Sequence, residues 1–314
     1  MKVVSFKQIK DLNINMLTYY TWANEVFMIK GECQLPPKIS MKKEGHIFFN
    51  IMPSIIDKIK VAGVKVVDRF PERNPSLDSQ IMLYNSNNGE NIAFMDGNII
   101  TAYRTGAVAA LAINTLAIEN YETVGILGLG VIARATFDIL VQTLNGRKIN
   151  VKLLKYKNAA ELFVERYKEY SFIDFEIVET TKELIENSDV VISCVTSADK
   201  NFGEDEWFKE GCLVVPVHTM GFQNCDLFFD KVIVDDIGHV NNFKYFDKFK
   251  EVHELTDVLN NNKLGRINNK ERILAYNIGN SIFDIYFAKK IYDLLEKQNL
   301  QTIDLEIPTE KFWI

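Results

Sequence analysis

The stretch Thr-Val-Gly-Ile-Leu-Gly-Leu-Gly-Val-Ile-Ala, residues 123–133, decides the fold of this chain. Its first five residues form a short apolar run, which is typical of a strand buried in a parallel sheet. Gly128 and Gly130 follow, and the amphipathic segment after them predicts a helix over 133–144. A strand, a glycine-rich turn and a helix in this order predict the opening of a Rossmann domain.

This turn also predicts a dinucleotide site. Gly128 permits the tight turn, Gly130 lets the backbone approach a pyrophosphate, and Ala133 keeps the helix close to the strand. The exposed N–H groups of the first helical turn would hold the anion. The alternative is a glycine-rich turn that binds nothing. The residues expected to bind the cofactor are Thr105, Gly128, Gly130, Val131, Ile132, Ala133, Lys155, Lys157 and Thr196.

Beyond the motif, β-branched runs alternate with longer amphipathic stretches, which predicts a parallel sheet wound with helices. The expected strands are 123–127, 149–154, 175–178, 190–194, 212–217 and 231–234, and the expected crossover helices are 133–144 and 159–170. An Ala-rich helix is expected over 101–117, where small residues allow close packing. One long helical pattern covers 271–296.

The first 117 residues show a different pattern. Pro36-Pro37, Met52-Pro53 and the Asn-rich segment 85–89 read as turns between short strands, and Asn-Gly predicts a hairpin between Tyr84 and Ala93. The predicted class is therefore α/β. It combines a Rossmann doubly wound parallel sheet domain over 118–284 with an α+β domain over 1–117 plus 285–314.

Composition and charge exclude several classes of protein. The chain has 314 residues, 47% hydrophobic and 25% charged, which is typical of globular domains. Its net charge of −6 and its interspersed charges argue against a nucleic-acid partner. No apolar stretch looks long enough to span a membrane, and no export leader is recognised. The cysteines, Cys33, Cys194, Cys212 and Cys225, form no CxxC pair, so we expect reduced thiols, no metal site and a cytoplasmic protein.

The end of the second Rossmann strand bears on the choice of nucleotide. An NAD site usually has an acidic residue there, which accepts hydrogen bonds from the ribose. Residues 151–158 contain no carboxylate, and Lys155 and Lys157 stand in its place. Two cations favour a 2′-phosphate, so we predict NADP, with NAD as the alternative if the lysines are merely solvated.

Several segments resemble the ornithine cyclodeaminase/μ-crystallin family in order and spacing. They are Met52-Pro53, Ala-Gly-Val-Lys-Val-Val at 62–67, Ala-Phe-Met-Asp-Gly at 93–97, Thr-Ala-Tyr-Arg-Thr-Gly-Ala at 101–107, and the turn at 128–133. The resemblance implies a first domain with the substrate pocket and a dimer sheet, a Rossmann domain, and a C-terminal helix that returns to the first domain. It thus implies a homodimer that acts on a small amino or imino acid.

The same resemblance implies that Lys65 and Arg104 bind the substrate carboxylate and serve catalysis, with Lys38 as a third cation. Their chemistry agrees, because a guanidinium grips a carboxylate through two bonds and an ammonium adds charge and a proton. On its own pattern, Lys65 could equally be a solvated strand residue. Arg104 lies on an otherwise apolar helix, where a buried guanidinium needs a partner.

The chain departs from the family after the fifth strand. Family cyclodeaminases carry Gly-Ala-Asp there, with the aspartate in proton transfer, whereas this chain has His218 and Thr219 in that region and lacks the aspartate. A histidine exchanges protons near neutral pH, so His218 is the predicted proton-transfer residue. Asp226 and Asp284 are further candidates, each alternatively a helix cap or an ion-pair partner.

Three functions stay open on this basis. The first is an NAD(P)-dependent oxidoreductase that transfers a hydride at the C–N carbon of a small α-amino or α-imino acid, as a ketimine reductase or an amino-acid dehydrogenase does. The second is ornithine cyclodeamination, which yields proline and ammonia. The third is a nucleotide-binding protein without turnover.

Overall fold

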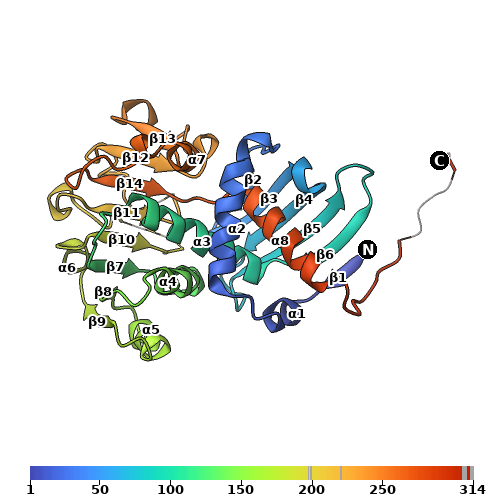
Figure 1. The fold of residues 1–314 in the computed structure, drawn as a ribbon, viewed down its shortest axis with the longest axis horizontal. Helices are drawn as coiled ribbons and strands as arrows, with labels where there is room; N and C mark the ends of the chain where they lie inside the picture. Colours follow the sequence, from blue (N-terminus) through green and yellow to red (C-terminus); the bar gives the residue numbers. More distant parts are fainter. Residues whose placement is uncertain (197, 199, 220, 306–309, 312–314) are drawn as a thin grey trace. The chain divides into compact units, whose positions relative to one another are not determined.

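The computed structural model describes residues 1–196, 198, 200–219, 221–305, 310 and 311. The chain divides into two compact units (Figure 1). Unit 1 comprises Met1–Asn13, Glu32–Thr101 and Ser281–Ile314, and unit 2 comprises Ile14–Gly31 and Ala102–Asn280. Each unit has its own sheet.

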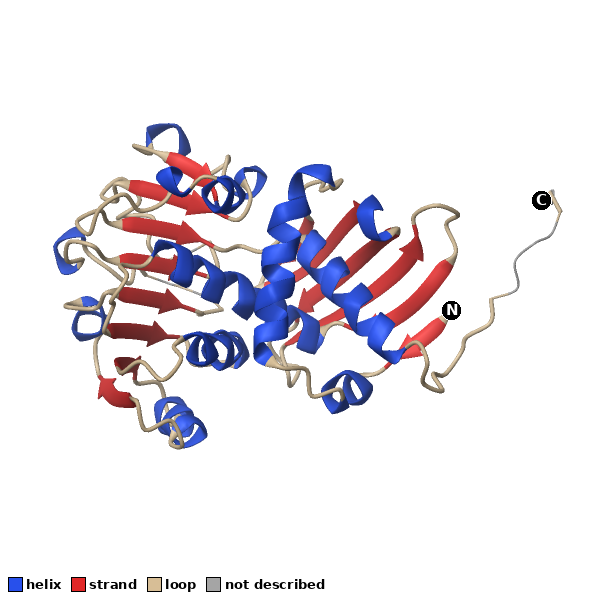
Figure 2. Ribbon diagram, viewed as in Figure 1, coloured by secondary structure: helices blue, strands red, loops and turns tan. Residues whose placement is uncertain are grey.

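Unit 1 is built on a six-stranded sheet in the order β1-β6-β5-β4-β3-β2. Strands β2 to β6 pair antiparallel with their neighbours, and β1 pairs parallel with β6. Helix α8 (Ser281–Leu295) packs on β3, β4 and β5 (Figure 2), while α1 (Phe6–Asp11) follows β1. This is the predicted α+β unit. Its strands are β1 (Lys2–Val4), β2 (Ile39–Lys43), β3 (Ile47–Ile56), β4 (Val61–Arg69), β5 (Leu77–Asn85) and β6 (Asn91–Asp96).

Sequence and register agree at the β5–β6 hairpin. Gly89 has a φ of +73°, and its N–H donates to the carbonyl of Asn85, so the Asn-rich segment forms the expected turn. Glycine is suited to this position because side chains disfavour a positive φ.

Met52-Pro53 is not a turn, contrary to the prediction. Both residues lie inside β3, where Pro53 faces Val64 of β4. Strand β2 pairs with β3 only as far as Ile51, and the N–H of Ile55 points away from β4 to Gln34. Since alternate residues share an orientation, the nitrogen of Pro53 faces the open edge and no ladder bond is lost.

Unit 2 is built on an eight-stranded, entirely parallel sheet in the order β13-β12-β14-β11-β10-β7-β8-β9. The chain runs outward from β7 to β8 and β9 and then returns to place β10 on the other side of β7, which is the doubly wound Rossmann topology that was predicted. The strands are β7 (Thr123–Leu127), β8 (Ile149–Leu154), β9 (Ile173–Val178), β10 (Val190–Ser193), β11 (Leu213–Pro216), β12 (Lys231–Val234), β13 (Val252–Glu254) and β14 (Ile273–Tyr276).

The helices of unit 2 connect and cover these strands (Figures 1 and 2). Helices α4, α5 and α6 link β7, β8, β9 and β10 in turn. Helix α2 packs on α4 and α7. The bounds are α2 (Met16–Ile29), α3 (Asn98–Leu116, in this unit from Ala102), α4 (Val131–Thr143), α5 (Ala159–Tyr167), α6 (Thr181–Ile185) and α7 (Leu255–Asn260).

The prediction of one helix over 271–296 is wrong. Ile273–Tyr276 forms β14, a strand buried between β11 and β12, and the helix begins only at Ser281. A short run that is apolar on every side fits a buried strand as well as a buried helix, so periodicity could not separate them. Gly279, with a φ of +85°, interrupts the chain between the two elements.

The units differ from the expected domain boundaries at α2 and α3. A Cβ added to Gly106 of α3 would lie 2.6 Å from the backbone of Ala135 in α4, so the small residues of α3 allow the expected close packing. This packing groups α2 and most of α3 with the parallel sheet. Helix α3 is also long and apolar enough to cross a membrane by length and composition, but it is mostly buried, as core helices are.

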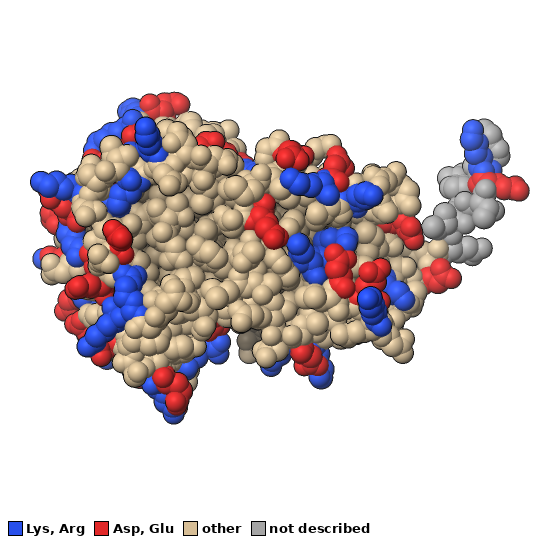
Figure 3. Space-filling view, viewed as in Figure 1, with Lys and Arg blue, Asp and Glu red and all other residues tan. Residues whose placement is uncertain are grey.

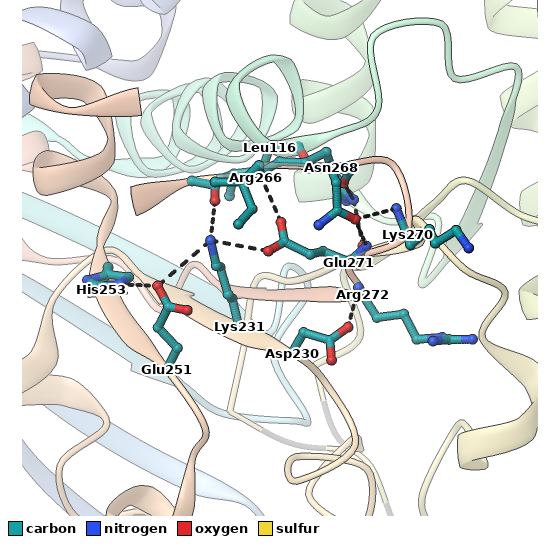
Figure 4. A network of polar contacts seen from close by, with 12 residues as sticks. Leu116, Asp230, Lys231, Glu251, His253, Arg266, Asn268, Lys270, Glu271 and Arg272 are labelled. Carbon is teal, nitrogen blue, oxygen red and sulfur yellow. Dashed lines mark hydrogen bonds and ion pairs between the residues drawn. The ribbon is translucent and has the colours of Figure 1, made fainter. Parts of the chain in front are cut away.

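A polar network closes the amino-terminal edge of the parallel sheet (Figure 4). The ammonium of Lys231, buried at the start of β12, donates to the carbonyl of Gly265 at 2.6 Å and lies 3.4 Å from a carboxylate oxygen of Glu271. Arg266 donates to the carbonyls of Leu116 and Glu271. Ligands of such sheets bind at the opposite, carboxyl edge, so this network serves the fold.

Two further features of the molecule are the distribution of its surface charges and the burial of its cysteine thiols. On the face drawn in Figure 3, acidic and basic side chains are interspersed and no basic stripe is formed. Cys194, Cys212 and Cys225 are buried free thiols, and Cys33 is partly exposed. Burial raises the pKa of Cys194 and of Cys212 to about 12, which makes both thiols unreactive.

Candidate functional site

The glycine-rich turn lies at the switch point of the parallel sheet, between the carboxyl ends of β7 and β10. Gly128 has a φ of +81°, and a Cβ there would lie 2.6 Å from both the carbonyl carbon of Cys194 and the nitrogen of Val195. Both the conformation and the close approach to β10 therefore require glycine. Open doubly wound sheets bind their ligands at such a point.

Gly130 leaves the amino end of α4 open. It is the N-cap residue, no side chain caps the helix, and a Cβ added to it would meet nothing within 4 Å. Val131 is 70% exposed, Ile132 is partly exposed, and Ala133 is buried against the sheet. The first turn of a three-turn helix thus presents backbone N–H groups to open space, an arrangement that fits a pyrophosphate.

Lys155 and Lys157 lie just after β8, as predicted, but a carboxylate accompanies them. Nζ of Lys155 lies 2.6 Å from Oε1 of Glu179, and this hydrogen bond raises the pKa of Lys155. Lys157 has a φ of +51° and lies near the ring of Tyr156. Glu179 was missed because it follows the neighbouring strand. The signal was available, since parallel strands end side by side and Leu154 pairs with Val178.

Two threonines complete the predicted nucleotide set. Thr105 is buried on α3, next to Arg104 in the chain, and Thr196 lies on an exposed segment that follows β10 at the carboxyl edge of the sheet. Thr196 directly follows Val195, whose backbone nitrogen lies close to Gly128. Their role at a nucleotide stays a prediction.

Lys65 is a buried cation of unit 1. It lies in the middle of β4 under α8, and its Nζ is 2.7 Å from Oδ2 of Asp284, with side chains 1% and 0% exposed. The alternative of a solvated strand lysine is therefore wrong, and Asp284 is an ion-pair partner. The pair joins a strand and a helix that lie far apart in the sequence.

Arg104 is a buried cation of unit 2. The residue is only 6% exposed on α3, and its guanidinium approaches Gly279 so closely that an added Cβ would be 2.0 Å from one terminal nitrogen. Lys38, the third predicted cation, is a partly exposed residue of unit 1 just before β2. Lys65 and Arg104 belong to different units.

His218 follows β11 and is held from the end of β10. Oγ of the fully buried Ser193 lies 2.6 Å from Nε2 of His218. The two strands are parallel neighbours, and Ser193 pairs with Pro216 in their ladder. Ser193 was missed by sequence reasoning, because nothing local distinguishes a strand-end serine that meets a histidine from the next strand. Thr219 is partly exposed beside it.

Asp226 serves a different purpose from proton transfer at the turn. It is buried and accepts a hydrogen bond from the hydroxyl of Tyr276 at 2.6 Å, within the apolar core of unit 2. Burial raises the pKa of Asp226 to about 6. Its partner is thus a tyrosine and not a cation. Among the residues that the structure describes, no three metal-binding side chains gather.

A comparison with protein families decides the identity of this arrangement. The profile of the Ornithine cyclodeaminase/mu-crystallin family matches residues 10–299, which is nearly the whole chain. The chain belongs to that family. The resemblance carried by the segments at 62–67 and 101–107 is therefore confirmed, and so is the Rossmann fold that it implied.

Relatives within the ornithine cyclodeaminase/mu-crystallin family differ in the reaction that their names describe. The chain is 28% identical over 281 residues to N-((2S)-2-amino-2-carboxyethyl)-L-glutamate dehydrogenase of Staphylococcus aureus, covering 83% of each chain. It is 31% identical to ketimine reductase mu-crystallin of Macropus fuliginosus over 52% of each chain. It also superposes on Thermococcus litoralis Delta(1)-pyrroline-2-carboxylate reductase in complex with NADH and L-proline, with a TM-score of 0.84, 26% identity, and 97% and 100% coverage.

Proposed function

We propose that this member of the family is a nicotinamide-nucleotide-dependent oxidoreductase that acts at the C–N carbon of a small α-imino or α-amino acid. The observation that carries the proposal is the buried ammonium of Lys65 in β4, which pairs with Asp284 of α8. A buried ion pair contributes little net stability, so its presence points to a role with a ligand. The relatives that reduce imines or oxidise amines supply the substrate class.

Each charged group has a defined task in this proposal. Lys65 and Arg104 bind the substrate carboxylate, the first as a point charge and the second through a planar fork. His218 delivers the proton to the imine nitrogen, with its ring oriented by Ser193. Lys38 adds positive charge to the substrate region of unit 1.

The turn at Gly128 and Gly130 would hold the nucleotide, whose nicotinamide supplies the hydride when it is bound. One hydride joins the carbon of the C=N bond and one proton joins the nitrogen, so an imino acid becomes an amino acid while the nucleotide is oxidised. The same groups serve the reverse reaction, in which the nitrogen loses its proton to His218.

We further propose that the nucleotide is NADP. Lys155 and Lys157 are the charges next to the ribose end of a Rossmann site, and a 2′-phosphate would attract both. Since Glu179 already engages Lys155, the preference over NAD is modest. Both lysines are well exposed, so the preference weakens as salt rises.

A substrate panel with both nucleotides tests the function. We expect 1-pyrroline-2-carboxylate or a related imino acid to oxidise the reduced nucleotide, seen as a loss of its absorbance. L-Ornithine that gives proline and ammonia without a net absorbance change would instead identify a cyclodeaminase. Tight nucleotide binding with no turnover of either compound would contradict both enzymatic functions.

The outer face of the unit 1 sheet supports a homodimer. The register places Pro53, Val64, Met82 and Phe94 in one row across four strands, on the face opposite Lys65 and α8. Further apolar residues extend this face, and it carries a cavity of about 310 Å³ lined by Gln34, Pro36, Pro53, Ser54, Ile55, Ala62, Gly63, Val64 and Tyr84. Exposed apolar area of this extent marks an interface.

The oligomeric state in solution tests this interface. We expect light scattering to give a dimer for the parent and a monomer for Phe94→Glu, because a charge would be buried at the interface. Leu162→Glu on α5 is the matched control, since it places the same charge on an exposed residue of unit 2. A parent that is monomeric, or a Phe94→Glu variant that stays dimeric, would contradict the proposal.

The compartment and the wider partners follow from the same reasoning. We propose that the enzyme works in the cytoplasm on a small molecule, without nucleic acid or membrane as a partner. Free thiols and interspersed charges support this assignment. We also propose that residues 1–117 and 285–314 carry the dimer face and the cations that bind the substrate, and that residues 118–284 carry the nucleotide site and His218.

A further inference from the structure

Gly279 lies in close contact with the guanidinium of Arg104. A Cβ added to Gly279 would lie 2.0 Å from Nη1 of Arg104, 2.9 Å from Cζ and 3.1 Å from Nη2. A Cβ at this position would collide with Nη1, the nearest of the three atoms, so only glycine leaves room for the guanidinium where it lies. The φ of +85° adds a second reason for glycine at this position.

A buried carboxylate holds Gly279 in place. Asp235, directly after β12, is fully buried, and its Oδ2 accepts the N–H of Gly279. Two further bonds fix Asp235 itself. Its own N–H donates to the carbonyl of Tyr276 at 3.1 Å, and its carbonyl accepts from the buried ammonium of Lys30 at 2.8 Å.

Asn277 and Gly279 attach the segment after β14 through their backbone N–H groups. The N–H of Asn277 donates to the carbonyl of Pro216 at 2.9 Å, and the N–H of Gly279 donates to the carboxylate of Asp235. The position of Gly279 therefore depends on Asp235. A fully buried carboxylate is costly unless it is compensated, and burial raises the pKa of Asp235.

We propose that Asp235 is a positioning residue for the reaction. Through Gly279 it sets the position of the Arg104 guanidinium, and it thereby determines how well the site selects substrates with a carboxylate on the reacting carbon. This inference rests on the proposed role of Arg104 and adds two residues, Asp235 and Gly279, that touch neither substrate nor nucleotide.

Asp236 provides a matched control. It is the next residue in the chain, and its carboxylate pairs with the same Lys30 at 2.9 Å, whereas the N–H of Gly279 donates to Asp235. A substitution at Asp236 therefore removes a carboxylate from the Lys30 cluster and leaves the backbone under Arg104 in place.

The experiment compares two substrates that differ in one group. They are 1-pyrroline-2-carboxylate and 1-pyrroline, the same cyclic imine without the carboxylate. The ratio of their kcat/KM values measures selection by the carboxylate. We expect Asp235→Ala and Gly279→Ala to lower this ratio by about tenfold to a hundredfold, mainly through KM, because displacement of a binding group by about 1 Å has an effect of that order.

The controls separate positioning from folding. Asp235→Asn keeps an oxygen that accepts the Gly279 N–H, so its ratio stays close to that of the parent, and Asp236→Ala keeps it as well. Nucleotide affinity stays unchanged in all variants. Equal losses with both imines would show that Asp235 only stabilises the fold and would overturn the proposal. Gly279→Ala tests the same contact if Asp235→Ala does not fold.

Crystal structures of the parent and of Gly279→Ala distinguish this inference from the proposed function. If the parent turns over neither imine, the proposed function fails, but the guanidinium of Arg104 should still move when Cβ is added. If the parent is active and the guanidinium keeps its place in Gly279→Ala, the positioning role is wrong and the proposed function stands.

Discussion

Replacement of Asp284 by leucine should separate the two consequences of the buried Lys65–Asp284 pair. The side chains are 1% and 0% exposed and their charged atoms are 2.7 Å apart. Removal of one partner of a buried ion pair costs about 3–5 kcal/mol, because the other charge stays buried without its counter-charge from that partner. At about 1.4 kcal/mol per decade, the unfolding equilibrium of Asp284→Leu should shift toward the unfolded state by roughly 10²-fold to 4 × 10³-fold.

Urea denaturation of three variants measures this effect. In the double variant Lys65→Met/Asp284→Leu both charges are gone and the space stays filled, so stability should return to about the parental value. Activity should not return, because Lys65 is required for the substrate carboxylate. As a control, Asp11→Asn breaks the exposed Lys7–Asp11 pair and should change stability little.

Two results would refute this reasoning. Parental stability in Asp284→Leu would mean that the pair is not effectively buried. An active double variant would mean that Lys65 has no part in the reaction, and the function proposed for it would fall.

Four further predictions concern single residues. Arg104→Ala should lower kcat/KM for the imino acid by about 10²-fold with unchanged nucleotide affinity, measured by steady-state kinetics and titration. His218→Asn should lower kcat by about 10²-fold, the lower range for a lost general acid, and a parent pH profile that is flat through neutrality would argue against this role. Glu179→Gln frees Lys155 and should raise the preference for NADP over NAD, an effect that disappears at high salt. Burial raises the pKa of Asp226 from 3.8 to about 6, so between these pH values the folded state binds more protons than the unfolded state. The free energy of unfolding should therefore fall as pH rises through that range, and Asp226→Asn should flatten this dependence.

The sequence predicted the elements whose signals are local. The strands at 123–127, 149–154 and 231–234 have the predicted bounds, because each is a short apolar run next to a turn or a crossover helix. The glycine turn was predicted in detail, since a positive φ and a close backbone approach both need glycine. The error at 273–276 has the opposite cause, because a strand buried on both faces carries no alternation.

The site could be predicted only in part, because its partners come from distant segments. Lys65 and Arg104 were found through the family resemblance, but their burial and their contacts were not. Glu179 and Ser193 each meet a residue from a neighbouring strand, and Asp235 acts through the backbone of Gly279. Such pairs follow from strand order, which single-sequence patterns do not determine.

Segment 271–296, which the sequence pattern wrongly predicted as one helix, contacts both Arg104 and Lys65. Its strand β14 ends in a turn whose Gly279 supports Arg104, and the helix that follows carries Asp284, which holds Lys65. One continuous helix could not do this, because the guanidinium needs a glycine with a positive φ and no side chain beside it, whereas the ammonium needs a carboxylate on a buried helical face. The strand, the turn and the helix therefore meet two different requirements within one short stretch of chain. Insertion of a residue between Gly279 and Asp284 should rotate the start of α8 and weaken the Lys65–Asp284 ion pair, while the position of the Arg104 guanidinium stays unchanged. Stability and carboxylate selection should then change independently, and a parallel loss of both would show that the two contacts do not act separately.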